Sequence, residues 1–240
     1  MPIASAPGHG RWLPRPPGQC AVCLRWQAQA LCADCLDRHA QWVPRCARCG
    51  LRLAAPAAAC GACLAESPPY AACSVAFDYG FPWDRLIADF KFGGQVALAG
   101  PLAQRLLQAV RHDASGLPDW VLPVPLSASR LAQRGYNQAW ELARRIARAL
   151  GLRSDATLLL RHLEGAPQAS LGLAQRRANL NGAFVVDPAR RISLQGAHVA
   201  LVDDVMTSGA TLAEAARALQ RAGAARVDAW VLARTPAPAD

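Results

Sequence analysis

Two adjacent carboxylates, Asp203 and Asp204, stand at the end of an apolar run and are followed at once by a turn rich in hydroxyl groups and glycine. The apolar run, residues 199–202, is β-branched and aliphatic with no helical period, so it predicts a buried strand. A helix is expected next, because Thr211 and Glu214 have the spacing of a capping box and apolar residues recur behind them at helical intervals. The sequence therefore predicts a strand, a tight loop and a helix, with both acids at the carboxyl end of the strand.

The chemistry that suits these residue types is the binding of a phosphorylated sugar. A loop that enters a helix presents unpaired N–H groups and the positive end of the helix dipole, and Gly209 lets a phosphate approach the backbone closely. The two carboxylates would repel a phosphate, but they suit the hydroxyls of a ribose or a Mg²⁺ ion bound to it. The alternative is an ordinary strand-to-helix turn in which the Asp and Thr side chains act only as caps.

The segment VALVDDVMTSGAT resembles the phosphoribosyl pyrophosphate (PRPP) motif of the type I phosphoribosyltransferases. In that motif, hydrophobic residues precede two acids and a Thr/Ser-Gly-x-Thr loop. The resemblance implies that Asp203 and Asp204 bind the ribose hydroxyls of PRPP, which carries Mg²⁺. It also implies that the loop that follows wraps the 5′-phosphate, with the residues Met206, Thr207, Ser208, Gly209, Ala210 and Thr211.

A second polar loop precedes a helix earlier in the chain. The stretch WVLPVP predicts a strand, although Pro123 and Pro125 cost ladder hydrogen bonds and would normally confine it to a sheet edge. Residues 137–150 predict an amphipathic helix. The guanidinium groups between them suit a pyrophosphate, and in type I phosphoribosyltransferases the loop after an earlier strand holds the pyrophosphate of PRPP; surface charge is the alternative. The residues assigned to this role are Ser127, Arg130, Arg134 and Gly135.

The connection between the expected strands 157–161 and 183–186 is about twenty residues long, more than an idle loop usually needs. We interpret it as a lid that keeps water from a reactive sugar cation. An ordinary helical insertion explains the length equally well. The polar side chains assigned to the lid are Gln168, Arg176, Arg177 and Asn179.

Eight of the nine cysteines form four CxxC pairs near the N-terminus. Two pairs can complete a tetrahedral zinc site that leaves no ligand position open, so the pairs predict two structural Zn²⁺ sites whose metal supplies much of the folding free energy. Sequential grouping is favoured, although the spacing does not exclude a cross-braced one. The ninth cysteine, Cys73, is expected to be a buried thiol. The expected ligands are Cys20, Cys23, Cys32 and Cys35 in one site, and Cys46, Cys49, Cys60 and Cys63 in the other.

The length of 240 residues allows one domain of ordinary size and a smaller appendage. We expect a disordered tail over 1–19, a double zinc ribbon over 20–66 and a phosphoribosyltransferase-like domain over 70–235. The chain has no apolar run of about 18 residues, which argues against membrane insertion. The N-terminal residues lack the apolar core of a signal peptide, which predicts a cytoplasmic protein.

Basic residues outnumber acidic ones by 26 to 17, which gives a net charge of +9, and arginines are dense in the N-terminal segment. Together with Trp12, Trp26 and Trp42, these arginines predict contacts to the phosphates and bases of a single-stranded nucleic acid. Ribbons that are purely structural or that bind protein are an equal alternative, with the tryptophans as the small core of the module. Lys91 is the only lysine of the chain, which we attribute to codon usage rather than to chemistry.

In chain order, the double ribbon and the segments FKFGG, PVPLSASRLAQRGYNQA, PQASLGLAQRRANLNGAF and VDDVMTSGAT resemble the ComF family, which includes the GntX-like proteins. The resemblance extends from about Cys20 to Leu232. Its most specific piece is RGYNQA, in which Tyr136 stands where the family usually has Phe; Met206 likewise replaces a more usual polar residue. The implied fold is an α/β, type I phosphoribosyltransferase-like, twisted and mainly parallel sheet with flanking helices and a site at the carboxyl ends of its strands.

The resemblance also implies a function in natural competence, in which the chain handles single-stranded DNA alongside DNA-processing proteins and binds PRPP or a nucleotide as a ligand or signal. One alternative is a working phosphoribosyltransferase in which Asp203, Asp204 and Mg²⁺ hold the ribose and two arginines hold the leaving pyrophosphate. The other alternative is a scaffold or regulator whose ribbons bind protein. Pyrophosphate release separates the first two functions, and single-strand binding separates the third from the first.

Overall fold

The computed structural model describes residues 18–113, 116–162 and 182–237. Nearly all of the tail predicted over 1–19 therefore lies outside the described residues. The same holds for all four side chains that we assign to a lid, Gln168, Arg176, Arg177 and Asn179.

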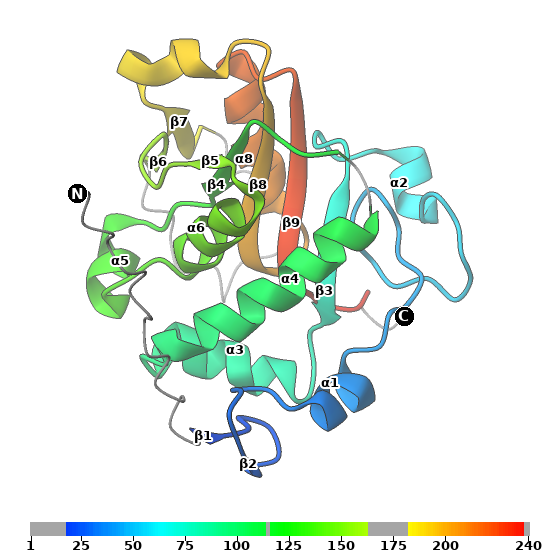
Figure 1. Cartoon of the computed structure of the whole chain (residues 1–240). Coiled ribbons are helices and arrows are strands. Elements are labelled where there is room, and N and C mark those ends of the chain that lie inside the picture. The colour runs from blue at the N-terminus through cyan, green and yellow to red at the C-terminus, as the bar shows by residue number, and fades with distance from the viewer. Residues whose placement is uncertain (1–17, 114–115, 163–181, 238–240) are drawn as a thin grey trace, which may run out of the picture.

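A five-stranded parallel sheet forms the centre of the molecule, with the strand order β3-β9-β8-β4-β5 (Figure 1). The two longest strands, β8 and β9, pair in parallel along their length and end with Met206 opposite Arg234. The fold predicted from the sequence, a parallel sheet with flanking helices and cysteine-rich units at the N-terminus, is confirmed. The strands are β3 (Cys73–Asp78), β4 (Trp120–Pro123), β5 (Arg153–Ser154), β8 (His198–Met206) and β9 (Arg226–Arg234).

Helices cover both faces of this sheet (Figure 1). One face carries α3 (Trp83–Phe92), α4 (Ala99–Asp113) and α6 (Gln138–Leu150). The other carries α8 (Ala210–Arg221) and an antiparallel pair of short strands, β6 (Leu159–Arg161) and β7 (Phe184–Val186). The remaining elements of this region are η1 (Val96–Leu98), α5 (Ala128–Arg134) and η3 (Pro188–Leu194).

Each face of the sheet has its own apolar core. Leu106 of α4 and Ile146 of α6 are buried on one side, and Leu212 and Leu219 of α8 are buried on the other. Fully burying one such side chain contributes about 1.5–3 kcal/mol. The helical spacing of these residues thus fixes the helices on a rigid sheet, whose carboxyl-terminal edge can hold a site in place.

β4 is an interior strand, contrary to the edge position that its prolines predict. Val124 N donates to Val202 O of β8 at 2.9 Å. Because successive residues of a strand direct their N–H groups to opposite sides, Pro123 and Pro125 face away from β8. On that side β5 pairs only with the first two residues of β4. The prolines therefore stand where β4 has no partner strand, and they cost no ladder hydrogen bond.

The N-terminal residues form two small cysteine-rich units. The first unit contains β1 (Gly18–Gln19), β2 (Trp26–Gln27) and α1 (Ala33–His39). The second contains an isolated bridge between Arg45 and Arg52, followed by α2 (Gly61–Ala65). In Figure 1 the first unit lies beside α3 and the second lies beside β3.

Hydrogen bonds dock the first unit on the helices α3 and α4. Trp83 donates its indole N–H to His39 O at 2.8 Å. Arg105 of α4 donates to the carbonyl of Ala40, and its guanidinium lies 3.9 Å from the ring centroid of Trp42. These contacts satisfy carbonyl groups at the end of α1, so the first unit is packed against the sheet domain rather than tethered beside it.

Candidate functional site

The two adjacent acids lie on the carboxyl-terminal half of β8, because this strand continues to Met206 instead of ending at Val202 as the sequence predicts. Asp204 is buried, and its Oδ2 lies 3.1 Å from Lys91 Nζ. Burial and the neighbouring Asp204 carboxylate raise the pKa of Asp203 to about 8, although the Lys91 charge opposes the shift. The two carboxylates thus form a coupled pair that a further cation would stabilise in its ionised form.

Lys91 is a site residue that the sequence analysis did not identify. Although the sequence analysis attributed no chemistry to this lysine, the structure pairs it with Asp204. The side chain of Lys91 is 19% exposed and reaches the acid from the last turn of α3. The available signal was its position inside FKFGG, a segment that carries the family resemblance.

The RGYNQA segment holds the end of α3 that carries Lys91. Tyr136 donates its hydroxyl to Phe90 O, and Gln138 donates its side-chain N–H to Lys91 O at 3.3 Å. A Phe at position 136 could not make the first of these bonds. Both bonds fix the backbone from which the ammonium group reaches Asp204, so this segment acts on the acid pair through α3.

Arg134 lies between α3 and α6, in a position that sequence reasoning did not predict. Its guanidinium is 4.7 Å from the ring centroid of Phe92 and donates to Gln138 Oε1 at 3.1 Å. Burial lowers the pKa of Arg134, and the charge of Asp204 opposes this shift. Gly135, with φ of 77°, ends α5 as a left-handed C-cap. Both residues therefore have structural roles, while the charge of Arg134 is still felt at the acid pair.

The predicted pyrophosphate loop is largely helical, because α5 occupies most of it. Ser127 is the N-cap of α5, and its hydroxyl accepts a hydrogen bond from Arg130 N at 3.4 Å. Arg161, at the end of β6, is a further cation whose charge interacts with an acid of the pair: burial lowers the pKa of Arg161, Arg130 lowers it further and Asp203 opposes the shift. The sequence gave no signal for Arg161, which is a single arginine at a strand end outside any quoted motif.

The phosphate loop, as we name residues 206–211, connects β8 to α8. Met206 is buried, whereas Thr207 and Ser208 are exposed. Gly209 is the N-cap residue of α8 and has φ of 78°, a conformation that side-chain-bearing residues rarely adopt. The loop therefore presents two hydroxyl side chains and the N-terminus of a helix at the same edge of the sheet as the acids.

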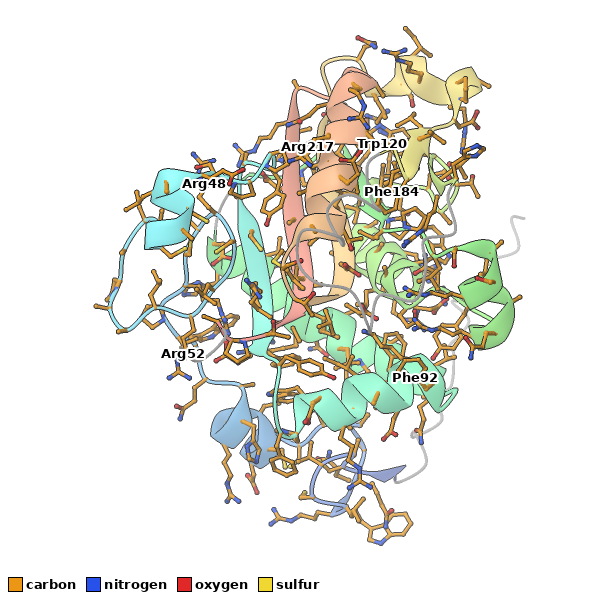
Figure 2. All side chains as sticks on the ribbon, turned by 180° about the vertical axis from the view of Figure 1, so that it is seen from behind. Arg48, Arg52, Phe92, Trp120, Phe184 and Arg217 are labelled. Atoms are coloured by element: carbon orange, nitrogen blue, oxygen red, sulfur yellow. The ribbon has the colours of Figure 1, made fainter. Side chains whose placement is uncertain are left out.

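The capping box predicted at Thr211 and Glu214 is wrong. α8 begins at Ala210 after the left-handed Gly209, which has no side chain to cap it, while Ser208 Oγ accepts a hydrogen bond from Ala210 N at 3.4 Å; Thr211 therefore already lies inside the helix. Glu214 is buried, and its Oε1 accepts a hydrogen bond from Gly182 N at 3.2 Å. Its carboxylate also pairs with the arginines of the next turns of α8, Arg217 at 3.3 Å and Arg221 at 3.1 Å (Arg217 is labelled in Figure 2).

Three cationic side chains act on the two carboxylates at the carboxyl end of the sheet, and a fourth, Arg130, acts on two of those cations. Carboxylates bind sugar hydroxyls or a divalent cation, and guanidinium groups bind phosphate oxygens in pairs. Adjacent N–H groups at a helix N-terminus bind a further phosphate. This donor set fits a sugar that carries both a phosphate and a pyrophosphate with Mg²⁺. The cations are Lys91, Arg130, Arg134 and Arg161.

Replacing Lys91 with Met should lower the free energy of unfolding by about 3 kcal/mol, because it leaves the buried Asp204 carboxylate without its partner. Urea denaturation measures this loss. The double variant Lys91→Met/Asp204→Asn should recover at least half of it, since the unpaired charge is then gone. Simple addition of the two single effects would show that this ion pair does not couple the two residues.

The eight cysteines of the CxxC pairs form two clusters in sequence order. Within each cluster the four sulfur atoms lie within 4.8 Å of one another, and all are free thiols. The Sγ atoms are 3.7 Å apart between Cys23 and Cys32, and also between Cys49 and Cys60. Zn–S bonds of about 2.3 Å at tetrahedral angles give nearly this spacing. The first cysteine cluster is Cys20, Cys23, Cys32 and Cys35; the second cysteine cluster is Cys46, Cys49, Cys60 and Cys63.

Backbone N–H groups point at the cysteine sulfurs, as expected for thiolates that bind a metal. Cys60 N donates to Cys46 Sγ at 3.3 Å, and Cys32 N donates to Cys20 Sγ at 3.4 Å. Burial alone would raise the pKa of Cys46, but the N–H groups around its sulfur outweigh burial and lower the pKa to about 7. The donor set and the spacing of the sulfur atoms therefore fit two structural zinc ions. Cys73 is buried outside both clusters, as predicted.

Residues 96–240 match the family model described as the phosphoribosyl transferase domain. The chain is 37% identical over 226 residues to the DNA utilization protein YhgH of Salmonella typhimurium, a match that covers 91% of this chain and 98% of that protein. It is 34% identical over 220 residues to competence protein F of Haemophilus influenzae, covering 90% and 95% of the two chains. A structure of the allosteric regulatory enzyme of purine biosynthesis overlaps 57% of this chain and 26% of that one, with 20% identity and a TM-score of 0.39.

The fold, the acid pair and the family match define a protein with a phosphoribosyltransferase domain. Its similarity to YhgH and competence protein F extends over nine tenths of the chain, and it follows that the chain belongs to the ComF family. Among the residues that the structure describes, no helix is long and apolar enough to cross a bilayer.

Proposed function

We propose that this chain binds PRPP, or a closely related nucleotide, with Mg²⁺ and handles single-stranded DNA during natural competence in the cytoplasm. The observation that carries the sugar-phosphate part is the placement of Asp203 and Asp204 beside the phosphate loop at one edge of the sheet. In this proposal the acids take the ribose hydroxyls and the phosphate loop takes the 5′-phosphate. Arg130 and Arg161 provide positive charge for the pyrophosphate.

The DNA part of the proposal is supported by the names of the relatives, a DNA utilization protein and a competence protein. A surface feature of the first unit agrees with it. Trp26 is 68% exposed in that unit, whereas Trp42 packs on Arg105. An exposed indole among arginines can stack on a base while the arginines meet the phosphates. Trp26 is therefore the more accessible of the two, since Trp42 is 46% exposed and has one face covered by Arg105.

Calorimetry of the full chain with PRPP and Mg²⁺, repeated in the presence of single-stranded DNA and coupled to a pyrophosphate-release assay, tests the proposal. We expect PRPP binding, DNA binding, and an altered affinity of one when the other is present. PRPP binding without any DNA binding would contradict the DNA part and favour ribbons that bind protein. Absence of PRPP and nucleotide binding would contradict the assignment of the acid pair.

A working phosphoribosyltransferase is the second candidate, because the site combines acids for the ribose with cations for a leaving group. In that reaction the bond between the anomeric carbon and pyrophosphate breaks, and an acceptor atom takes the place of pyrophosphate. The cations would stabilise the charge that develops on the departing group. Steady release of pyrophosphate in the presence of an acceptor would establish this activity.

Replacing Trp26 with Ala should weaken binding of single-stranded DNA about tenfold, because stacking of one base contributes about 1–3 kcal/mol. Fluorescence anisotropy of a labelled oligothymidylate at fixed salt measures the change. Leu24→Ala is the matched control, since Leu24 is 65% exposed on the same turn but offers no aromatic face. Equal losses for the two variants, or no loss for either, would remove Trp26 from the DNA surface.

A further inference from the structure

Arg234, the last residue of β9, connects the second cysteine cluster to the phosphate loop. Its Nε donates to Cys49 O at 3.1 Å. Its Nη1 donates to Met206 O at 3.3 Å and to Thr207 O. Thr235 N adds a backbone bond to Met206 O at 3.0 Å. One guanidinium therefore bridges a metal-ligand residue and the first residues of the phosphate loop.

The second unit is packed tightly on the edge strand β3, which pairs with β9. Cys73 N of β3 donates to Ala47 O at 2.8 Å, and Arg45 pairs with Asp78 of β3 at 2.6 Å. Gly50 has φ of +68°, and a Cβ there would meet the Val75 side chain at 2.3 Å. The second unit therefore has little room to shift as a whole on β3. The position of the Cys49 carbonyl then depends on whether the second unit keeps its own fold.

A second contact supports the loop from the same side. Tyr70 follows the second unit in the chain, is buried, and places its hydroxyl 4.0 Å from Met206 Sδ. A Cβ on Gly209 would come within 3.2 Å of that hydroxyl. Cys49, Tyr70 and Ser208 line a common cavity of about 1130 Å³ formed by described residues. The second cysteine cluster and the phosphate loop are thus neighbours.

We propose that Arg234 is a positioning residue that makes the conformation of the phosphate loop depend on metal in the second cysteine cluster. With an ion bound, the four thiolates hold the second unit together and keep the Cys49 carbonyl in place. Arg234 can then bind this carbonyl and the phosphate loop at the same time. Without the ion, the second unit loses the metal that connects its two CxxC pairs, and Arg234 loses its hydrogen bond to Cys49 O while it keeps those to the phosphate loop. Regulation of the PRPP site, which rests on the proposed function, would then follow the metal content of the second cluster and not of the first.

Thermodynamic linkage makes this coupling reciprocal: a ligand on the phosphate loop must tighten metal binding at the second cluster by the same factor. Couplings of this kind commonly change affinity about 5- to 150-fold. The first cysteine cluster provides the internal comparison, because its unit docks on α3 and α4 through His39 and Ala40 instead.

The test is a double-mutant cycle on the full-length zinc-loaded chain, with PRPP and Mg²⁺ as the probe in calorimetry. Arg234→Ala and Cys60→Ser should each weaken PRPP binding at least tenfold, and the double variant should be little weaker than either single one. Cys23→Ser in the first cluster should change the affinity less than threefold. Arg52→Ala is the matched arginine control, because Arg52 lies in the second unit, contacts Asp78 and is 63% exposed (Figure 2).

Hydrogen exchange of the backbone amides over 205–211, without ligand, separates this inference from the proposed function. Arg234→Ala and Cys60→Ser should both speed exchange in the phosphate loop, while Cys23→Ser and Arg52→Ala should not. If PRPP fails to bind but this exchange pattern appears, the coupling holds and only the ligand is wrong. Because Arg234→Ala keeps all eight cysteines, it stays informative if Cys60→Ser fails to fold. Unchanged exchange in Arg234→Ala, or fully additive losses of affinity, would overturn the inference.

Discussion

Replacing Asp204 with Asn should weaken binding of PRPP and Mg²⁺ at least 100-fold, to below detection in calorimetry. The carboxylate of Asp204 is buried, and its one ion-pair partner among the described residues is Lys91 at 3.1 Å. The neutral amide keeps the shape of the side chain but leaves the Lys91 ammonium uncompensated beside the place where a second cation must bind. A loss of about 3 kcal/mol in binding corresponds to roughly that factor.

Asp84→Asn is the control for this variant, because Asp84 lies at the opposite end of α3 from Lys91, where its Oδ1 accepts a hydrogen bond from Arg85 N at 2.7 Å. It should bind PRPP as the unmodified chain does. Thermal denaturation of both variants separates loss of the ligand site from loss of the fold. A folded Asp204→Asn protein with unchanged PRPP affinity would remove the acid pair from the ligand site, whatever the family resemblance implies.

Sequence alone predicted the strand and the helix around the acids. The pattern of apolar residues differs between a strand and a helix, and it depends only on residues close together in the chain. The run before Asp203 and the apolar spacing behind Gly209 were enough to place β8 and α8. The exact start of α8 was not predictable in the same way. Two chemically reasonable starts, a Thr cap and a left-handed glycine, lie within three residues of each other, and only the backbone conformation distinguishes them.

The partners of the acids could not be predicted, because they come from elements distant in the chain. Lys91 reaches Asp204 from α3, and Arg161 approaches Asp203 from β6. A motif search favours residues that are close in sequence, and so it selected Arg134, whose guanidinium packs against Phe92 (labelled in Figure 2) while its charge still acts on Asp204. Hydrogen bonds from Tyr136 and Gln138 hold the end of α3 that carries Lys91, and the spacing of residues along a single helix or strand does not reveal such contacts.

The position of β4 shows the same limit in the backbone. Pro123 within β4 and Pro125 just after it made an edge strand the reasonable expectation. What permits an interior position is the shortness of β5, which pairs with β4 only as far as Val121. The N–H groups that the prolines lack would lie on the side of β4 where β5 offers no carbonyl acceptor. The length of a neighbouring strand is a tertiary property, so the sequence of β4 could not reveal this compensation.

Replacing Cys46 with Ser should reduce bound zinc from two ions to one and unfold the second unit. Cys46 is fully buried, and the backbone N–H groups directed at its sulfur stabilise the thiolate that a metal needs. A serine hydroxyl offers a poor ligand, so most of the binding free energy of that ion is lost, and in zinc-finger peptides such free energy is about 10–16 kcal/mol. Elemental analysis counts the ions, and thermal denaturation should show a lower Tm, because a chain of this length loses about 2–4 °C for each kcal/mol of stability.

Cys73→Ser is the matched control, because Cys73 is equally buried but lies outside both clusters. Cys73→Ser should destabilise the core while leaving two zinc ions bound. The two variants are therefore compared by their number of bound zinc ions and not by their Tm. Full retention of two ions in Cys46→Ser would contradict the ligand assignment. Loss of both ions would show that the two clusters fold as one cooperative unit, although the first docks on α3 and α4 and the second on β3. One ion lost and one retained is the result that two closed, independent four-cysteine sites require.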